Sequence, residues 1–289
     1  MNTLNTTNRI LIISPVRNEE QYLLKTIESV LSQSIRPNRW IIVDDGSSDK
    51  TYSIAKSVAQ KNSWVTVCKR KDRGQRSLGG GVVKAFYAGL SEVAGERYEF
   101  IGKVDGDVVI SPLYFERLLE KFQEKPRLGI ASGWIKGEEP KSFAPLGPVK
   151  LYRTECFKDI GGLVSFVGWD TIDCYEAMRK GWKTQVFWDE VFRIEHLRKM
   201  GSSHKGLIHG NFRSGQACYF ANYHPLYFLS KVLKRSTQYP IIVGGSALLH
   251  GYIKLWLKRA PRHGDSEFRK FVRRFQLRYL LKTINPFIK

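Results

Sequence analysis

Two pairs of carboxylates have the spacing that binding of a cation or a nucleotide requires. Asp105 and Asp107 are separated by one glycine, so both can converge as hard oxygen ligands on one Mg²⁺ or Mn²⁺ ion. Asp-Gly-Asp also forms ordinary β-turns, which is the structural alternative. Asp44 and Asp45 are adjacent, and two neighbouring carboxylates exceed what one capping turn needs. Because a carboxylate accepts hydrogen bonds from an imide or a ribose hydroxyl, the second pair favours nucleotide recognition.

Alternating strand and helix signals place these carboxylates at the ends of strands. Short apolar runs typical of buried strands cover residues 10–14, 40–43, 65–68 and 100–104, with segments of helical periodicity between them. This alternation predicts an α/β fold with a parallel sheet covered on both faces. Ligands of such sheets bind beyond the carboxyl ends of the strands. The polar segments 15–19, 44–49 and 105–107 each follow a predicted strand, so we expect them to form a single site.

Further signals predict where helices begin. Asn18 and Ser111 have the side chains and the following residues of helix N-caps. Asp170 begins another helix. Residues 182–188 and 191–194 are predicted strands, and the chain from about residue 202 is predicted to be helical.

Four segments in this order resemble the signatures of the family 2 glycosyltransferases with the GT-A fold. They are Ser14-Pro15-Val16-Arg17-Asn18-Glu19-Glu20, Val43-Asp44-Asp45-Gly46-Ser47-Ser48-Asp49, Asp105-Gly106-Asp107 and Gly168-Trp169-Asp170. The resemblance covers roughly residues 8–200 and is specific for the family but not for a substrate. It implies a Rossmann-like, mostly parallel sheet flanked by helices. It also implies inverting transfer from a nucleotide-diphosphate sugar, most commonly UDP-linked, with Mn²⁺ or Mg²⁺ as cofactor.

The resemblance also assigns roles to individual residues. The nucleotide-sugar positions fall on Pro15, Arg17, Glu19, Asp44, Asp45 and Asp105, and the metal positions on Asp105 and Asp107. Asp170 matches the general base, which removes the proton of the acceptor hydroxyl as it attacks the anomeric carbon. Capping of its own helix is the structural role open to Asp170. Trp169 replaces the glutamate that usually precedes the base, and its ring is of a kind that stacks on sugars.

His196 follows Asp170 by 26 residues and comes just after a predicted strand. In several family members a histidine near this position completes the metal shell, which makes His196 a candidate ligand. A structural role is the alternative for a lone histidine, and His204, His209 and His224 compete for the assignment.

Positive charge is concentrated in the last third of the chain. The net charge is +20, which calls for a polyanionic partner or surface. Residues 1–188 contribute +6, whereas residues 189–289 carry 19 basic and 5 acidic side chains, a net +14. We therefore divide the chain into a GT-A catalytic domain over residues 1–201 and a helical, basic region over residues 202–289.

The basic region has the pattern of a surface that lies on a membrane. Residues 225–234 and 265–282 predict amphipathic helices with basic flanks, and the apolar stretch 240–257 is interrupted by His250 and Lys254. These features favour in-plane attachment to an anionic membrane leaflet. Packing of the same helices on the catalytic domain is the alternative. A polar N-terminus unlike a signal peptide and four cysteines without paired spacing predict a cytoplasmic protein, peripheral on the inner face of the membrane.

Two other functions compete with sugar transfer. A basic nucleic-acid-binding protein would explain the charge, but no such signature is present and paired carboxylates repel a polyanion, so no nucleic-acid partner is expected. An inactive nucleotide-sugar-binding member of the family is the second alternative, and the intact Asp105, Asp107 and Asp170 argue against it. The chain lacks the Gln-x-x-Arg-Trp motif of processive synthases, so we expect addition of one sugar to a glycan or lipid-linked acceptor.

Overall fold

The computed structural model describes residues 9–72, 74, 80–137, 143–198 and 206–284. Contacts divide the chain into two compact units. One comprises residues 1–165 with 169–197, and the other residues 166–168 with 198–289. The predicted domain boundary after residue 201 lies outside the described residues.

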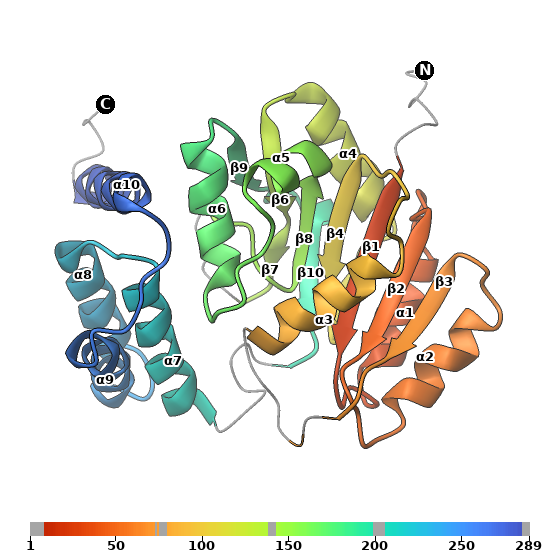
Figure 1. The fold of residues 1–289 in the computed structure, drawn as a ribbon, viewed down its shortest axis with the longest axis horizontal. Coiled ribbons are helices and arrows are strands. Elements are labelled where there is room, and N and C mark those ends of the chain that lie inside the picture. Colours follow the sequence, from red (N-terminus) through yellow and green to blue (C-terminus); the bar gives the residue numbers. More distant parts are fainter. Residues whose placement is uncertain (1–8, 73, 75–79, 138–142, 199–205, 285–289) are drawn as a thin grey trace. The chain divides into compact units, whose positions relative to one another are not determined.

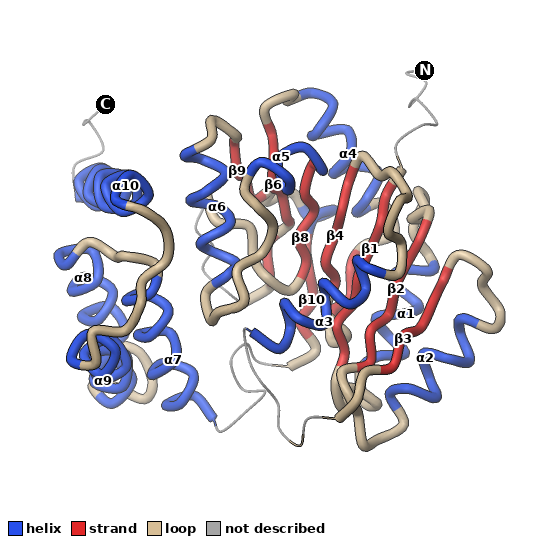
Figure 2. The backbone as a smooth tube through the Cα atoms, viewed as in Figure 1, coloured by secondary structure: helices blue, strands red, loops and turns tan. Residues whose placement is uncertain are grey.

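A seven-stranded sheet forms the centre of the first unit, with the strand order β3-β2-β1-β4-β8-β6-β9 (Figures 1 and 2). Its strands are β1 (Ile10–Val16), β2 (Arg39–Asp44), β3 (Val65–Lys69), β4 (Phe100–Val104), β6 (Leu128–Ser132), β8 (Val149–Arg153) and β9 (Lys183–Val186). The first four strands in this order are parallel, and β8 runs antiparallel to both of its neighbours. The predicted α/β fold with a mostly parallel sheet is therefore confirmed, with β8 as the antiparallel strand.

A second, three-stranded sheet has the order β5-β10-β7. It consists of β5 (Val108–Ile110), β7 (Trp134–Ile135) and β10 (Arg193–His196), which follows the 3₁₀ turn Glu190–Phe192. Because β5 comes directly after residues 105–107 and pairs with β10, this small sheet brings the end of β10 next to the Asp-Gly-Asp segment.

Six helices of the first unit cover the large sheet. They are α1 (Leu23–Leu31), α2 (Thr51–Ala59), α3 (Gly80–Ser91), α4 (Tyr114–Glu124), α5 (Thr154–Asp159) and α6 (Trp169–Arg179). Helices α3, α5 and α6 share one buried cluster with Ile13, Ile41 and Val43 of the sheet, so they lie on the same face (Figure 1). Phe100 of β4 points to the other face, where its ring lies 4.9 Å from the ring of Phe122 in α4.

Two predicted helix starts are wrong. Asn18 does not cap α1: it adopts a left-handed conformation with φ 53° and its side chain accepts a hydrogen bond from the Ser48 N–H at 2.9 Å. Ser111 does not cap α4, because its hydroxyl donates to the Val191 carbonyl oxygen at 2.8 Å. Both side chains bond to a distant segment instead of the next helix. The first strand also continues through Pro15, which pairs with Val43 in the ladder with β2.

The described part of the second unit consists of four helices: α7 (Gly206–Phe220), α8 (Pro225–Ser236), α9 (Val243–Leu257) and α10 (Ser266–Ile284). Helices α7 and α9 pack backbone against backbone. A methyl group added to Gly215 would lie 1.9 Å from the Leu248 carbonyl oxygen, and one added to Gly251 would lie 1.9 Å from that of Phe212. None of the described helices combines the length and the hydropathy that crossing a membrane requires.

Candidate active site

The polar ends of β1 and β2 are joined by the Arg17 side chain. Its guanidinium donates to the Asp45 carbonyl oxygen at 2.5 Å and to the Asp72 carboxylate at 2.7 Å. Pro15 is half-buried within β1, and Glu19 is buried, with its N–H donating to Thr51 Oγ1 at 2.7 Å. The segments after two parallel strands are thus held together as the sequence predicted.

Asp44 and Asp45 differ in what their carboxylates contact. Asp45 forms an ion pair with Arg70, from the segment after β3, at 2.5 Å. Asp44 is fully buried, and its Oδ1 accepts a hydrogen bond from the Ser47 N–H at 3.1 Å. The other oxygen, Oδ2, is also buried and has no hydrogen-bond partner among the described residues. An unsatisfied buried carboxylate oxygen is costly, so this atom is a candidate acceptor for a ligand.

Asp105 lies beside the segment that precedes β8. Its N–H donates to the Pro148 carbonyl oxygen at 2.8 Å, and its carboxylate accepts from the ammonium of Lys103. Lys103 is a buried residue of β4 and also donates to the Gly147 carbonyl oxygen at 2.7 Å. Burial raises the pKa of Asp105 and the nearby Asp107 raises it further, whereas the Lys103 ammonium opposes the shift. A cation bound near Asp105 would therefore stabilise the ionised form of its carboxylate.

Asp107 and His196 are the other two candidate metal ligands, and they lie next to each other. His196 ends β10, and its Nε2 lies 3.2 Å from Oδ2 of Asp107, which is itself buried. The competing His209 and His224 belong to the second unit, and His204 lies outside the described residues. No three histidine, cysteine or acidic side chains in the described ranges are arranged to hold a metal ion by themselves.

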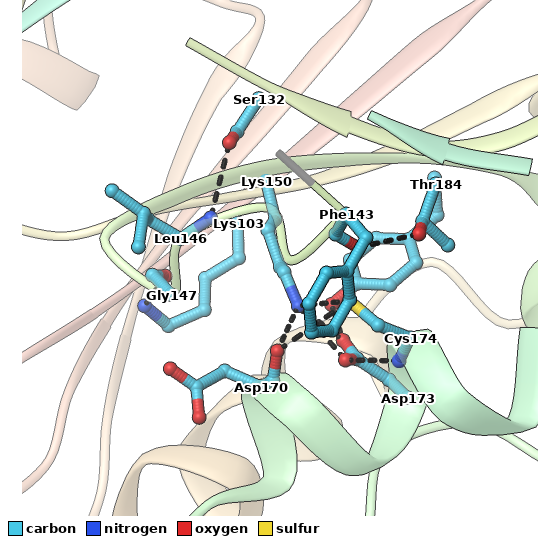
Figure 3. A network of polar contacts seen from close by, with 11 residues as sticks. Lys103, Ser132, Phe143, Leu146, Gly147, Lys150, Asp170, Asp173, Cys174 and Thr184 are labelled. Atoms are coloured by element: carbon cyan, nitrogen blue, oxygen red, sulfur yellow. Dashed lines mark hydrogen bonds and ion pairs between the residues drawn. The ribbon is translucent and has the colours of Figure 1, made fainter. Parts of the chain in front are cut away.

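Asp170 lies in the first turn of α6, next to the same segment that contacts Asp105. A methyl group added to Gly147 would lie 2.9 Å from Asp170 Oδ2. Figure 3 shows the Asp170 carboxyl group pointing away from Lys150, whose ammonium instead donates to the Asp170 carbonyl oxygen at 2.6 Å. Burial raises the pKa of Asp170, and the ammoniums of Lys150 and Lys103 limit the rise. A raised pKa suits a group that must accept a proton near neutral pH.

Two lysines that sequence reasoning missed support these carboxylates from inside the sheet. Lys103 and Lys150 are directly opposite each other in the β4–β8 ladder, and both are buried. Lys150 forms a buried ion pair with Asp173 at 2.7 Å (Figure 3). The two ammoniums lie 5.4 and 5.5 Å from the centre of the Trp169 ring. That ring is only 6% exposed, which argues against the expectation that it stacks on a sugar.

Comparison with known proteins places the chain in a family. A model described as glycosyl transferase family 2 matches residues 11–180. The chain belongs to glycosyl transferase family 2. It is 27% identical over 135 residues to the uncharacterized glycosyltransferase EpsJ of Bacillus subtilis, covering 46% of this chain and 36% of EpsJ. It is 24% identical over 204 residues to the poly-beta-1,6-N-acetyl-D-glucosamine synthase of Staphylococcus epidermidis, covering 60% of this chain and 45% of that protein.

The matched segments therefore span less than half of these two relatives. Solved structures of similar fold cover more of the chain. Staphylococcus aureus TarS 1–349 in complex with UDP-GlcNAc has a TM-score of 0.55 at 18% identity, covering 87% of this chain and 73% of that structure. The mannosyltransferase PcManGT of Pyrobaculum calidifontis, in complex with GDP-Man and Mn²⁺, has a TM-score of 0.55 at 14% identity, covering 97% and 88%. These likenesses establish the GT-A fold of this family 2 member.

Proposed function

We propose that the chain is an inverting glycosyltransferase that moves one sugar from a UDP-linked donor to a hydroxyl group of a glycan or lipid-linked acceptor. One observation carries the proposal. Asp105 donates its N–H to the Pro148 carbonyl oxygen, and a methyl group added to the neighbouring Gly147 would lie 2.9 Å from Asp170 Oδ2, so a candidate donor-binding carboxylate and a candidate base both lie beside the segment Gly147–Pro148. A site for sugar transfer needs these two groups close together, because the donor diphosphate and the acceptor hydroxyl flank one anomeric carbon.

The preference for uridine rests on Asp44. One of its oxygens already accepts from the Ser47 N–H, and the buried Oδ2 is the carboxylate oxygen without a hydrogen-bond partner among the described residues. Uracil presents one imide N–H, which matches one free acceptor. Guanine presents an N–H and an amino group side by side and would need two. Pairing with an ionised acceptor contributes about 1.5–3 kcal/mol, enough to select a base by roughly tenfold or more.

Asp105, Asp107 and His196 offer the ligand types that a divalent cation accepts, and phosphate oxygens of the donor would complete the site, since these three side chains are not arranged to hold an ion by themselves. Carboxylate oxygens and an imidazole nitrogen are ligands that Mn²⁺ accepts, and Mg²⁺ is commonly held by one or two carboxylates together with substrate phosphates. The 3.2 Å between Asp107 Oδ2 and His196 Nε2 is close to the distance of about 3 Å between neighbouring ligands of an octahedral ion. Such a cation, when bound, would neutralise charge on the departing diphosphate.

Asp170 is the proposed base. The acceptor oxygen forms a bond to the anomeric carbon from the side opposite the nucleotide, and the bond to the diphosphate oxygen breaks with its electron pair. The hydroxyl proton moves to the Asp170 carboxylate. Attack from the opposite side inverts the anomeric configuration, and a positioned base contributes about 10²–10⁴-fold to the rate. The raised pKa of Asp170 supports this role, since a more basic carboxylate accepts the proton more readily.

The acceptor is proposed to lie at a membrane. The net charge of +14 over residues 189–289 supports attachment of the basic region to an anionic leaflet, such as the inner face of the cytoplasmic membrane. A lipid-linked or cell-surface glycan would be available there.

A thermal-shift panel tests the donor proposal. UDP, GDP and CDP are each added with and without Mn²⁺, and the midpoint of unfolding is measured for the wild type, Asp44→Asn and Asp107→Asn. We expect UDP with Mn²⁺ to raise the wild-type midpoint most, Asp44→Asn to lose the preference for UDP, and Asp107→Asn to lose the effect of Mn²⁺. Equal responses to every nucleotide, or no response at all, would contradict the proposed donor.

A further inference from the structure

Helix α9 buries mainly small residues, with Leu248 as the large exception, and exposes several of its large apolar residues. Its inner face is rich in glycine, with Gly244, Gly245 and Gly251 all buried. Its outer face carries Leu249, Ile253, Trp256 and Leu257, and Trp256 is 56% exposed. A helix on the surface of a soluble domain shows the reverse pattern, because large apolar side chains are driven into the core. Small residues at the helix contact and large ones outside are typical of helices that face lipid.

The helix before α9 and the turn between them extend this apolar surface. Leu226, Leu229 and Leu233 lie on one face of α8, at helical spacing, and each is more than half exposed. The turn from α8 to α9 adds the exposed side chains of Tyr239, Ile241, Ile242 and Val243. We call residues 226–257 the α8–α9 face. It contains eleven of the eighteen large apolar side chains that are exposed among the described residues.

The backbone at Ile242 supports a functional origin for this exposure. Ile242 begins α9 at φ 62°, a conformation that β-branched residues rarely adopt, and its side chain is 67% exposed. Strained residues persist where the surrounding structure enforces them, and they gather at sites of function. Here the strain directs an isoleucine into solvent, where it gains no burial within the unit.

The charge around the α8–α9 face identifies its partner. Between Glu195 and Asp265 the chain has eleven lysine and arginine residues and no aspartate or glutamate. Exposed Lys234, Lys254 and Lys258 belong to the two helices or follow them directly. A second copy of the chain would bring the same positive charge to the contact and be repelled. An anionic lipid surface instead offers negative headgroups for the lysines and an apolar interior for the leucines.

Helix α10, the other predicted amphipathic helix, is a weaker candidate for this contact. The apolar stripe predicted on residues 265–282 belongs to α10, where Phe268 and Val272 are fully buried. The buried Gln276 side chain accepts a hydrogen bond from the His224 N–H at 2.7 Å, which ties α10 to the start of α8. Phe271, Phe275 and Tyr279 of the same stripe are half-buried, so α10 offers less exposed apolar surface than the α8–α9 face.

We infer that the α8–α9 face is the surface that inserts into an anionic phospholipid bilayer, with the turn at residues 239–243 and the outer side of α9 entering the apolar layer. This assignment rests on the proposed membrane attachment and specifies which residues perform it. Lys234, Lys254 and Lys258 then lie at the level of the headgroups, because long basic side chains extend toward the polar layer.

Flotation of the full chain with vesicles tests the assignment, using phosphatidylcholine alone and phosphatidylcholine mixed with phosphatidylglycerol. The variant Leu229→Glu is compared with Leu24→Glu, since Leu229 and Leu24 are 51% and 52% exposed but Leu24 belongs to α1. Leu281→Glu tests the exposed side of α10. We expect the wild type to float only with the mixed vesicles. Leu229→Glu should partition about ten- to a hundredfold more weakly, as loss of one buried leucine implies, with both controls unchanged.

Two further variants test whether Trp256 enters the apolar layer and whether the lysines of the α8–α9 face contribute to binding. Trp256→Phe should abolish most of the blue shift in tryptophan emission that vesicles cause, because Trp256 is the tryptophan placed to enter the apolar layer. Lys258→Gln should weaken partitioning about fivefold and Lys56→Gln, an exposed lysine of α2, should not.

Each outcome has a distinct meaning. If the wild type floats with neither vesicle, membrane attachment and the face assignment are both overturned, while the donor proposal is judged separately by its thermal shifts. If the wild type floats and Leu229→Glu floats equally well, only the face assignment fails. Self-association that Leu229→Glu abolishes, measured by analytical ultracentrifugation without vesicle binding, would make the face a contact between copies and overturn the inference.

Discussion

Replacing Lys150 by methionine removes one member of a buried ion pair and leaves the other without its charge partner. The side chains of Lys150 and Asp173 are 0% and 1% exposed, and the ammonium lies 2.7 and 2.8 Å from the two carboxylate oxygens. Methionine fills nearly the same volume, so the cost of a cavity is small. The cost of the unpaired buried carboxylate is about 3–5 kcal/mol. Total stabilities are commonly about 5–15 kcal/mol, so the effect should be large.

Urea denaturation followed by circular dichroism measures this cost. We expect Lys150→Met to lower the midpoint strongly and Lys121→Met to lower it little. Lys121 forms an exposed pair with Glu124, and such pairs contribute about 0–1 kcal/mol. The double variant Lys150→Met/Asp173→Asn should recover part of the loss, because it removes the unpaired charge as well.

Equal midpoints for Lys150→Met and Lys121→Met would refute the reasoning, since they would mean that Asp173 reaches water or another cation when Lys150 is absent. A double variant less stable than Lys150→Met would refute the pairing in a second way. It would show that the Asp173 carboxylate is stabilised mainly by its other contacts, the Tyr152 hydroxyl and the Cys174 N–H.

Four further predictions concern the site. Asp44→Asn should weaken UDP binding about tenfold or more in calorimetry, because a charged acceptor is lost. Gly147→Ala should lower transfer by about tenfold or more and leave UDP binding intact, because its methyl group would come within 2.9 Å of Asp170 Oδ2 and displace the base. The raised pKa of Asp170 predicts that the transfer rate falls with decreasing pH already above the ordinary aspartate value of about 4. The same shift means that the folded state favours the protonated carboxyl group. The contribution of Asp170 to the free energy of unfolding should therefore decline as the pH rises from the pKa of Asp170 in the unfolded state to its pKa in the folded state. Measuring the transfer rate and the stability of the wild type and of Asp170→Asn across pH tests both effects. His196→Ala should weaken Mn²⁺ binding in titrations with UDP present, and unchanged Mn²⁺ affinity would remove His196 from the ligand set.

The sheet and the strand ends were predictable because they follow from local patterns. The continuous apolar runs of β1, β2 and β4 are buried strands, the run of β3 is a half-buried strand at the edge of the sheet, and the carboxyl ends of these parallel strands meet at one edge. Asn18 shows where local patterns fail. Its sequence context is that of a cap, but a bond to Ser48, 30 residues away, takes its side chain. No window of neighbouring residues contains that competitor.

The buried lysines were unpredictable for a related reason. Lysine is almost never fully buried unless it is paired, and the partner of Lys150 is 23 residues distant on another element. For the α8–α9 face, only the apolar composition of its segments was predictable from the sequence. The interrupted apolar stretch was visible in the sequence, whereas the burial of its glycines against α7 depends on a contact between helices.

The register of β4 and β8 places two buried lysines beside the proposed donor-binding carboxylate and the proposed base. Lys103 and Lys150 face each other across this ladder, where like charges repel, so each needs its own compensation. Lys103 is compensated by Asp105 and Lys150 by Asp173, while the face of the Trp169 ring contributes to both without adding a charge.

Lys150 also holds the first turn of α6 through the Asp170 carbonyl oxygen. The backbone of the proposed base is therefore anchored by a strand residue. A glutamate at position 169 would add a further carboxylate beside Asp105, Asp170 and Asp173 and compete for the same two ammoniums. Tryptophan in its place leaves each ammonium with its own carboxylate. The departure from the usual Glu-Asp pair thus changes which side chains surround the two ammoniums next to Asp170. The Asp170 carboxyl group itself lies beside Gly147, where the acceptor hydroxyl is proposed to bind.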